Sequence, residues 1–319
     1  MCKGDGRKPV KTYKPMTIKK FTKLFVPPVV LKAWNRIKGE KEYREPLQPS
    51  PLPQIERHSD KMVLIGNGPS LLKSVELYKD EILKNDRIAV NFFASSDLYE
   101  QLRPNIYVFA DPAFFDVPEN QKKSMEALYH NIIFKTTWPI HIFMPSYAKG
   151  LELVTKLCSN QHVSVDFYSV VNQNIGPMSK FEAWEHNYIC PPMRNVMQLC
   201  IYLSIYWGYP ETYLLGADSS FLEQIRIDQE TNELYMLDTH FYEGKSVYLD
   251  ASLYKTKNGI IKGRLNDVKL HEKLSRMSLT FKYYDDLRQY AEYKQVKIYN
   301  ASEFSWIDVF ERRKLDNIK

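Results

Sequence analysis

A glycine-rich turn after three apolar residues is the first stretch whose residue types suggest chemistry. It reads Val63-Leu64-Ile65-Gly66-Asn67-Gly68-Pro69-Ser70, and a helical pattern follows over residues 71–83. Gly66 and Gly68 let the backbone approach a ligand, Ser70 can cap the helix, and the free N–H groups at a helix start favour an anion. The third glycine of a dinucleotide fingerprint and the Gly-Lys-Ser/Thr of a P-loop are both missing. We therefore predict a nucleotide-binding loop of neither type.

Short polar side chains also follow other apolar runs. Asn91 ends one run, Asp111 follows the next, and Asp218 comes after Leu214-Leu215-Gly216-Ala217. Ligands of an open parallel sheet bind beyond the carboxyl ends of its strands, so these groups are expected to share a site with Asn67. Such groups can hold a ribose or a pyrimidine edge. The alternative for each single residue is that Asn and Asp cap helices and form turns wherever a strand ends.

The elements that would position these residues alternate along the chain from residue 61 onward. Predicted strands cover 62–65, 87–91, 106–110, 131–134, 141–144, 163–167, 212–215 and 296–299. Predicted helices cover 71–84, 119–130, 146–159, 195–207 and 268–294. This alternation predicts an α/β, Rossmann-like fold with a mainly parallel sheet and helices on both faces. We expect a catalytic domain at 61–319, with a polar lid insertion at about 219–267.

The basic charge of the chain lies in its first residues. Residues 1–38 hold eleven Lys or Arg against one acid, which leaves 33 basic and 37 acidic residues in the remainder. Phe, Leu, Val and Trp alternate with these bases over residues 17–38, as in a segment that lies on an anionic membrane surface. The same segment could instead pack on its own domain or on a second subunit of a homo-oligomer. Residues 40–60 are predicted to be a Pro-rich linker, which completes an N-terminal unit at 1–60.

Composition excludes several other classes. The acidic body carries no nucleic-acid-binding motif, so we expect no nucleic acid as partner. The four cysteines have neither zinc nor disulfide spacing, which fits a reducing compartment. No run of eighteen apolar residues and no apolar signal region occurs. We therefore expect a cytoplasmic protein that is peripheral at the cytoplasmic face of the inner membrane.

Two blocks of the chain resemble the bacterial sialyltransferases that use CMP-activated sialic acid. They are residues 62–115, with Gly66 to Leu71 and the Phe-Ala-Asp-Pro-Ala-Phe-Phe segment at 109–115, and residues 190–245, with Trp207-Gly208-Tyr209 and Gly216-Ala217-Asp218. The MptE-like pterin diphosphokinase relatives share the Gly-x-Gly-Pro-Ser loop. The resemblance implies a GT-A-like variant of the Rossmann-like fold. It also implies transfer of sialic acid, or of a related keto-sugar acid, from a CMP donor to a cell-surface glycan of the lipopolysaccharide or capsule kind.

The resemblance also assigns site residues. Asn67, Asn91 and Asp111 fall where the sialyltransferases place asparagines around the cytidine nucleotide, although Asp111 departs from Asn. Asn195 stands where that family has Thr-Ser-Gly, so a hydroxyl contact is lost. The predicted nucleotide-binding set is Gly66, Asn67, Gly68, Ser70, Asn91, Asp111, Asn195 and Asp218.

His240 is the predicted general base. It lies in the polar lid close to Asp238, where a histidine can remove a proton from an acceptor hydroxyl near neutral pH. The resemblance implies the same role for a histidine after the Gly-x-Asp strand. Tyr242 is expected to hydrogen-bond the departing phosphate, and Arg194 can meet a phosphate or a sugar carboxylate. The alternative is that His240 is an exposed loop histidine.

One absent pattern bears on metal use: the sequence contains no Asp-x-Asp pair, which could hold a divalent ion. A nucleoside monophosphate leaving group needs less charge neutralisation than a diphosphate, so tyrosines and Arg194 could suffice. We therefore predict a metal-independent, inverting transferase with no cofactor beyond its CMP-sugar donor and with a glycan or glycolipid acceptor. One alternative is a diphosphokinase of the MptE-like branch, in which Asp111 and Asp218 hold Mg²⁺ around ATP phosphates. The other is a non-catalytic nucleotide-binding or scaffolding protein.

Overall fold

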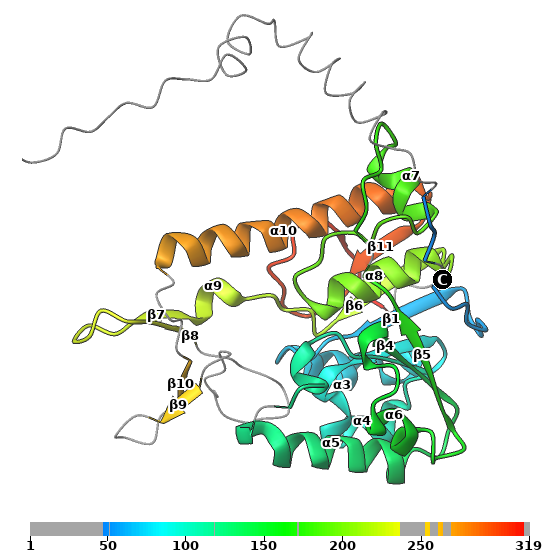
Figure 1. Ribbon diagram of the computed structural model, residues 1–319, viewed down its shortest axis with the longest axis horizontal. Helices are drawn as coiled ribbons and strands as arrows, with labels where there is room; N and C mark the ends of the chain where they lie inside the picture. The colour runs from blue at the N-terminus through cyan, green and yellow to red at the C-terminus, as the bar shows by residue number, and fades with distance from the viewer. Residues whose placement is uncertain are drawn as a thin grey trace, which may run out of the picture.

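Eight parallel strands form the central sheet of the protein (Figure 1). The computed structural model describes residues 47–50, 52–117, 119–170, 172–236, 253–255, 261–263 and 269–315. The strands are β1 (Lys61–Ile65), β2 (Asp86–Val90), β3 (Ile106–Val108), β4 (Ile140–Pro145), β5 (Val163–Tyr168), β6 (Glu211–Leu215), β11 (Lys297–Asn300) and β12 (Glu311–Arg312). Their order is β12-β11-β6-β1-β2-β3-β4-β5, and every neighbouring pair is parallel. The predicted α/β, Rossmann-like class is confirmed.

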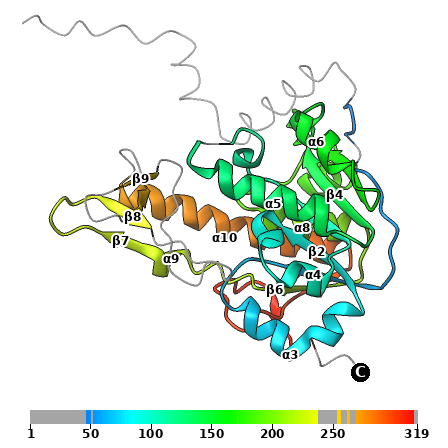
Figure 2. The same cartoon turned by 90° about the horizontal axis from the view of Figure 1, so that it is seen from below.

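Helices cover both faces of the sheet (Figures 1 and 2). One face carries α3 (Leu71–Leu83), α4 (Leu98–Leu102), α5 (Lys122–Lys135) and α6 (Glu152–Leu157), and the other carries α7 (Lys180–Glu185), α8 (Val196–Tyr206) and α10 (Leu270–Tyr293). Side chains of β1 alternate between the two buried clusters, with Met62 and Leu64 in one and Val63 and Ile65 in the other. A strand buried on both faces needs a continuous apolar run, and this explains the sequence of β1.

The strand order reverses between β1 and β6. From β1 the chain builds outward through β2 to β5, and it then returns to the other side of β1 with β6. Backbone pairing continues past the end of β1, because Gly66 N–H donates to Leu215 O (2.8 Å) and Gly68 N–H donates to Gly216 O (2.9 Å). Open α/β sheets bind ligands at such a reversal, so the fold itself marks this end of the sheet.

Two predicted elements differ from the structure. The predicted strand at 131–134 is wrong, since these residues belong to α5, whose buried positions Met125, Leu128 and Ile132 follow helical spacing. The predicted helix at 146–159 is broken into η4 (Ser146–Ala148) and α6. Gly150 separates them with a φ of +91°, a left-handed conformation that a helix cannot contain.

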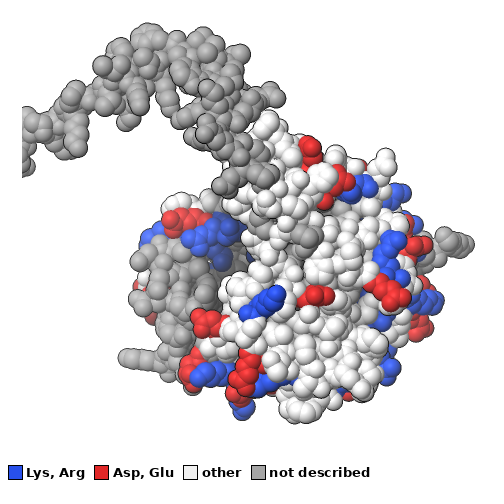
Figure 3. Space-filling view, turned by 45° about the vertical axis from the view of Figure 1, so that its right-hand side comes forward, with Lys and Arg blue, Asp and Glu red and all other residues white. Residues whose placement is uncertain are grey.

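Part of the predicted linker packs on the body. Leu52 is buried, Trp207 Nε1 donates to Pro53 O (2.9 Å), and His58 N–H donates to the buried Asp86 carboxylate (2.9 Å). The segment 17–38 lies outside the described residues. No helix within the described ranges has both the length and the apolar content needed to cross a bilayer. On the face shown in Figure 3, basic and acidic side chains are interspersed over the described body.

The predicted lid is described in part. It contains α9 (Phe221–Gln224), the antiparallel pair β7 (Ile225–Ile227) and β8 (Leu234–Met236), and the antiparallel pair β9 (Leu253–Lys255) and β10 (Ile261–Gly263). His240 and Tyr242 lie outside the described residues.

Candidate functional site

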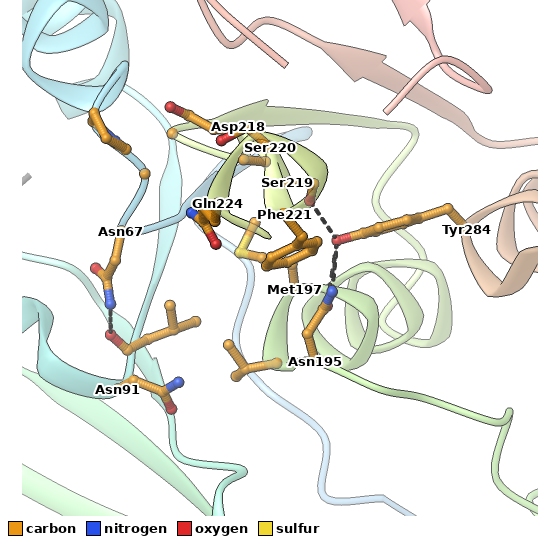
Figure 4. A pocket seen from close by; sticks show the side chains of 16 residues that line it. Asn67, Asn91, Asn195, Met197, Asp218, Ser219, Ser220, Phe221, Gln224 and Tyr284 are labelled. Atoms are coloured by element: carbon orange, nitrogen blue, oxygen red, sulfur yellow. Dashed lines mark hydrogen bonds between the residues drawn. The ribbon is translucent and has the colours of Figure 1, made fainter. Parts of the chain in front are cut away.

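A pocket of about 160 Å³ lies at the carboxyl ends of β1, β2 and β6 (Figure 4). Its lining includes five of the predicted site residues: Asn67, Gly68, Asn91, Asn195 and Asp218. A larger hollow of about 840 Å³ adjoins it, shares Asn91 and Asn195, and extends along the strand ends to Asp111 and Arg194. The pocket and the hollow thus contain residues from four distant stretches of the chain. They lie together because the carboxyl ends of parallel strands meet at one end of the sheet.

Asn67 and Asn91 each present an unpartnered amide oxygen. Asn67 Nδ2 donates to Val90 O (3.1 Å), and this bond determines which way the amide faces. The Oδ1 atoms of both asparagines are buried and accept no hydrogen bond. Leaving a buried acceptor unsatisfied costs about 1–3 kcal/mol, so such atoms in a pocket indicate a ligand that donates hydrogen bonds.

Backbone strain occurs at two pocket residues. Asn91 has a φ of +49°, and Ser219, which follows Asp218, also has a φ of +49°. Asparagine tolerates the left-handed region, whereas serine adopts it rarely. Strained residues of this kind concentrate at ligand sites, where the surrounding structure maintains them.

Ser70 contacts Asp218 instead of capping α3. Its side chain makes no capping hydrogen bond, so the predicted cap is wrong. The Ser70 hydroxyl donates to Asp218 Oδ1 (2.5 Å), and its backbone N–H donates to Oδ2 (3.0 Å). Asp218 is only 6% exposed, and this burial raises the pKa of its carboxyl group, while the hydrogen bonds from Ser70 oppose the rise. The anion expected at the start of α3 is a carboxylate of the protein itself.

The loop glycines make room for the end of β6. A Cβ on Gly66 would lie 2.9 Å from the Gly216 carbonyl carbon, and one on Gly68 would overlap the Asp218 carboxylate and lie 2.7 Å from Gly216 O. Gly216 itself has a φ of +60°. The close approach that these glycines permit is therefore between two segments of the chain, where we had expected a ligand.

Asn195 connects α8 to α10. Its Oδ1 accepts from Gln198 N–H (3.0 Å), which caps α8, and its Nδ2 donates to Tyr284 Oη (3.0 Å). Tyr284 is fully buried, which raises its pKa, and its Oη lies 3.5 Å from Ser219 Oγ. Tyr284 was not among the predicted site residues. Helical spacing in α10 indicates that this position is buried, but no local pattern indicates a contact 89 residues away.

Asp111 and Arg194 lie at the exposed part of the larger hollow. Asp111 Oδ1 accepts from Ala113 N–H (2.9 Å) and caps η2 (Pro112–Phe114), so the capping alternative holds for Asp111 as it does for Asn195. Within the described part of the chain, no three His, Cys, Asp or Glu side chains are grouped in a way that could hold a metal ion.

Fold and pocket together define an α/β protein with a pocket at the reversal of its strand order. No known family model matches the chain, and no curated protein matches it in sequence. Among solved structures it is similar to the MAf glycosyltransferase from Magnetospirillum magneticum AMB-1, with 11% sequence identity and a TM-score of 0.47 over 92% of the chain. The chain spans 43% of the length of that protein.

Proposed function

We propose that this protein is a glycosyltransferase that binds a nucleotide sugar where β1 and β6 meet and transfers the sugar to a glycan or glycolipid. The observation that carries the proposal is the pair of buried, unpartnered oxygens on Asn67 and Asn91. Ribose hydroxyls and the amino group of cytosine donate hydrogen bonds to such acceptors, whereas an ionised phosphate has only acceptors. The pocket therefore favours the nucleoside part of a ligand.

The larger hollow offers room for the rest of the donor. Arg194 at its exposed part presents a guanidinium that suits a phosphate or the carboxylate of a keto-sugar acid. In this proposal the donor is CMP-activated sialic acid or a relative of it. His240 removes the proton from the acceptor hydroxyl, which attacks the sugar directly with inversion, and Tyr242 hydrogen-bonds the departing phosphate. Residues 17–38 hold the enzyme at a membrane surface.

The diphosphokinase alternative has less support. It needs Asp111 and Asp218 to hold Mg²⁺, yet Asp218 is buried with both oxygens accepting from Ser70. Asp111 already caps a short helix through one oxygen. A carboxylate whose oxygens are engaged in this way would have to give up those hydrogen bonds to bind the ion.

Thermal stability in the presence of nucleotides tests the proposal. We expect CMP or CDP to raise the melting temperature without Mg²⁺, and UDP, GDP and ATP to have smaller effects. Stabilisation by ATP that requires Mg²⁺ would instead favour the diphosphokinase.

Two variants locate the binding. Asn91→Ala should weaken CMP binding by about 3- to 10-fold, the value of one neutral hydrogen bond. Gln295→Ala is the matched control, because Gln295 also has a left-handed φ (+56°) but is outside the pocket and the hollow. Equal loss of binding in the two variants would count against the proposed site.

A further inference from the structure

The start of helix α3 already holds an anion. In a strand, glycine loop and helix unit of this kind, the helix N-terminus attracts a negative group through its free N–H groups and its dipole. Here the Asp218 carboxylate takes that position, with one oxygen on the Ser70 N–H and the other on the Ser70 hydroxyl. Asp218 follows β6, the strand that pairs with the other side of β1, and it is 148 residues away from Ser70 along the chain.

The surrounding backbone is shaped for this carboxylate. Gly68 lacks the Cβ that would overlap Asp218 Oδ1, and Trp306 N–H donates to Asp218 O (2.8 Å), which holds the residue from the other side. The space that a phosphate would need beside the loop is thus filled. A phosphate brought to the same place would also meet a carboxylate of like charge.

The unpartnered groups of the pocket lie on a different side. Figure 4 shows Asp218 at one end of the pocket and Asn91 at the other, with Asn67 on the Asn91 side. Asn67 and Asn91 hold buried, unpartnered acceptors, which hydroxyl or amino groups satisfy and which repel phosphate oxygens.

We infer that Asp218 is a specificity-determining residue that excludes phosphate from the start of α3. A nucleotide consequently binds with its nucleoside over the loop and with its phosphate directed toward the larger hollow that Arg194 lines. The second half of this inference rests on the proposed function. The first half concerns inorganic phosphate alone, so it can be tested without any nucleotide.

The test measures melting temperature in phosphate against chloride at equal ionic strength. In Asp218→Ala the site is vacated, and about 20 mM phosphate should raise the melting temperature by about 3 °C or more relative to chloride. The wild type should change by less than about 1 °C. Asp218→Ser, which keeps a hydroxyl for the Ser70 N–H, is a second variant in case the alanine variant does not fold.

Two control variants separate exclusion from a general effect of phosphate. Ser70→Ala removes one hydrogen bond to Asp218 but keeps its charge, so it should respond as the wild type does. Asp86→Ala removes another buried carboxylate that accepts from two backbone N–H groups, at the amino end of β2 and therefore at the opposite end of the strands from the pocket. A phosphate response in Asp86→Ala equal to that of Asp218→Ala would overturn the inference.

The remaining outcomes are also decisive. If phosphate stabilises the wild type and Ser70→Ala abolishes the effect, phosphate binds at α3 in the native protein and the inference is wrong. If Asp218→Ala folds and its melting temperature does not rise in phosphate, Asp218 does not exclude phosphate from the start of α3, and the inference is wrong. Either result leaves CMP binding to be judged separately, and a failure of CMP to bind would leave the phosphate result standing.

Discussion

Substituting Gly68 and Asp218 singly and together tests whether the loop glycine exists to accommodate the carboxylate. A Cβ at Gly68 would overlap the Asp218 side chain and lie 2.7 Å from the backbone oxygen of Gly216. Gly66 is the natural comparison, because its Cβ would meet only backbone atoms of Leu215 and Gly216. Neither glycine has a left-handed φ, so alanine at either position is opposed by contacts and not by its backbone conformation.

The expected magnitudes follow from these contacts. Overpacking costs about 1–3 kcal/mol, so Gly68→Ala should lower the free energy of unfolding by about 2 kcal/mol. Asp218→Ala loses two hydrogen bonds to a charged group, which are worth about 1.5–3 kcal/mol each. This loss is partly offset because the variant no longer buries a carboxylate. In the double variant the new methyl group enters space that the carboxylate has left. The combined loss should therefore be smaller than the sum by about 1–2 kcal/mol.

Urea denaturation of the four proteins, with comparable slopes, measures this coupling. The same cycle with Gly66→Ala should be additive within about 0.5 kcal/mol, because removing the Asp218 side chain does not move the Gly216 backbone. Additivity in the Gly68 cycle, or equal coupling in both cycles, would refute the reasoning that Gly68 makes room for Asp218.

Three further predictions concern buried polar groups. Asp86→Ala should lower the free energy of unfolding, measured by urea denaturation, by about 3 kcal/mol. Asp86 is 2% exposed, and its carboxylate accepts hydrogen bonds from Tyr209 Oη (2.7 Å) and from the linker backbone. A decrease below about 1 kcal/mol would contradict this. Tyr284→Phe should cost about 1–2 kcal/mol and weaken CMP binding, since Asn195 loses a partner; unchanged stability and affinity would exclude this coupling. Because burial raises the pKa of Asp218 above its ordinary 3.8, its contribution to stability is fully present below about pH 3.8 and is lost as the pH rises through the raised value. The unfolding free energy of the wild type minus that of Asp218→Asn should accordingly fall from about pH 4 upward. If this difference rises with pH instead, the pKa of Asp218 is lowered in the folded protein, and the prediction is wrong.

Most of the sheet could be predicted because its strands are buried on both faces. Seven of the eight predicted strands correspond to β1 to β6 and β11. The exception at 131–134 contains Ile132, Ile133 and Phe134, a short β-branched and aromatic run that a strand and a buried helix turn share. The strand β12 could not be predicted, because Glu311 and Arg312 are polar and exposed and, within the described part of the chain, pair with β11 alone.

The location of the pocket could also be predicted, but its internal contacts could not. Strand ends are read from local patterns, and the parallel sheet then brings Asn67, Asn91 and Asp218 to one edge. The contact between Ser70 and Asp218 depends instead on the register of β1 against β6, which pairs Ile65 with Leu215. No spacing along the chain encodes that register.

The register also decides what the glycine-rich loop means. A turn of the Gly-x-Gly-Pro-Ser type leaves N–H groups at a helix start that favour an anion, and the turn alone does not show whether that anion belongs to a ligand or to the chain. In this protein Asp218 supplies it, and among the described residues that line the pocket the buried side-chain atoms without a hydrogen-bond partner are the Oδ1 atoms of Asn67 and Asn91. The chemistry demanded of a ligand is thereby reversed, from a negatively charged acceptor to a neutral donor. A nucleoside satisfies that demand where a phosphate does not, and this is why the same loop that first indicated phosphate binding now supports recognition of a ribose or a base.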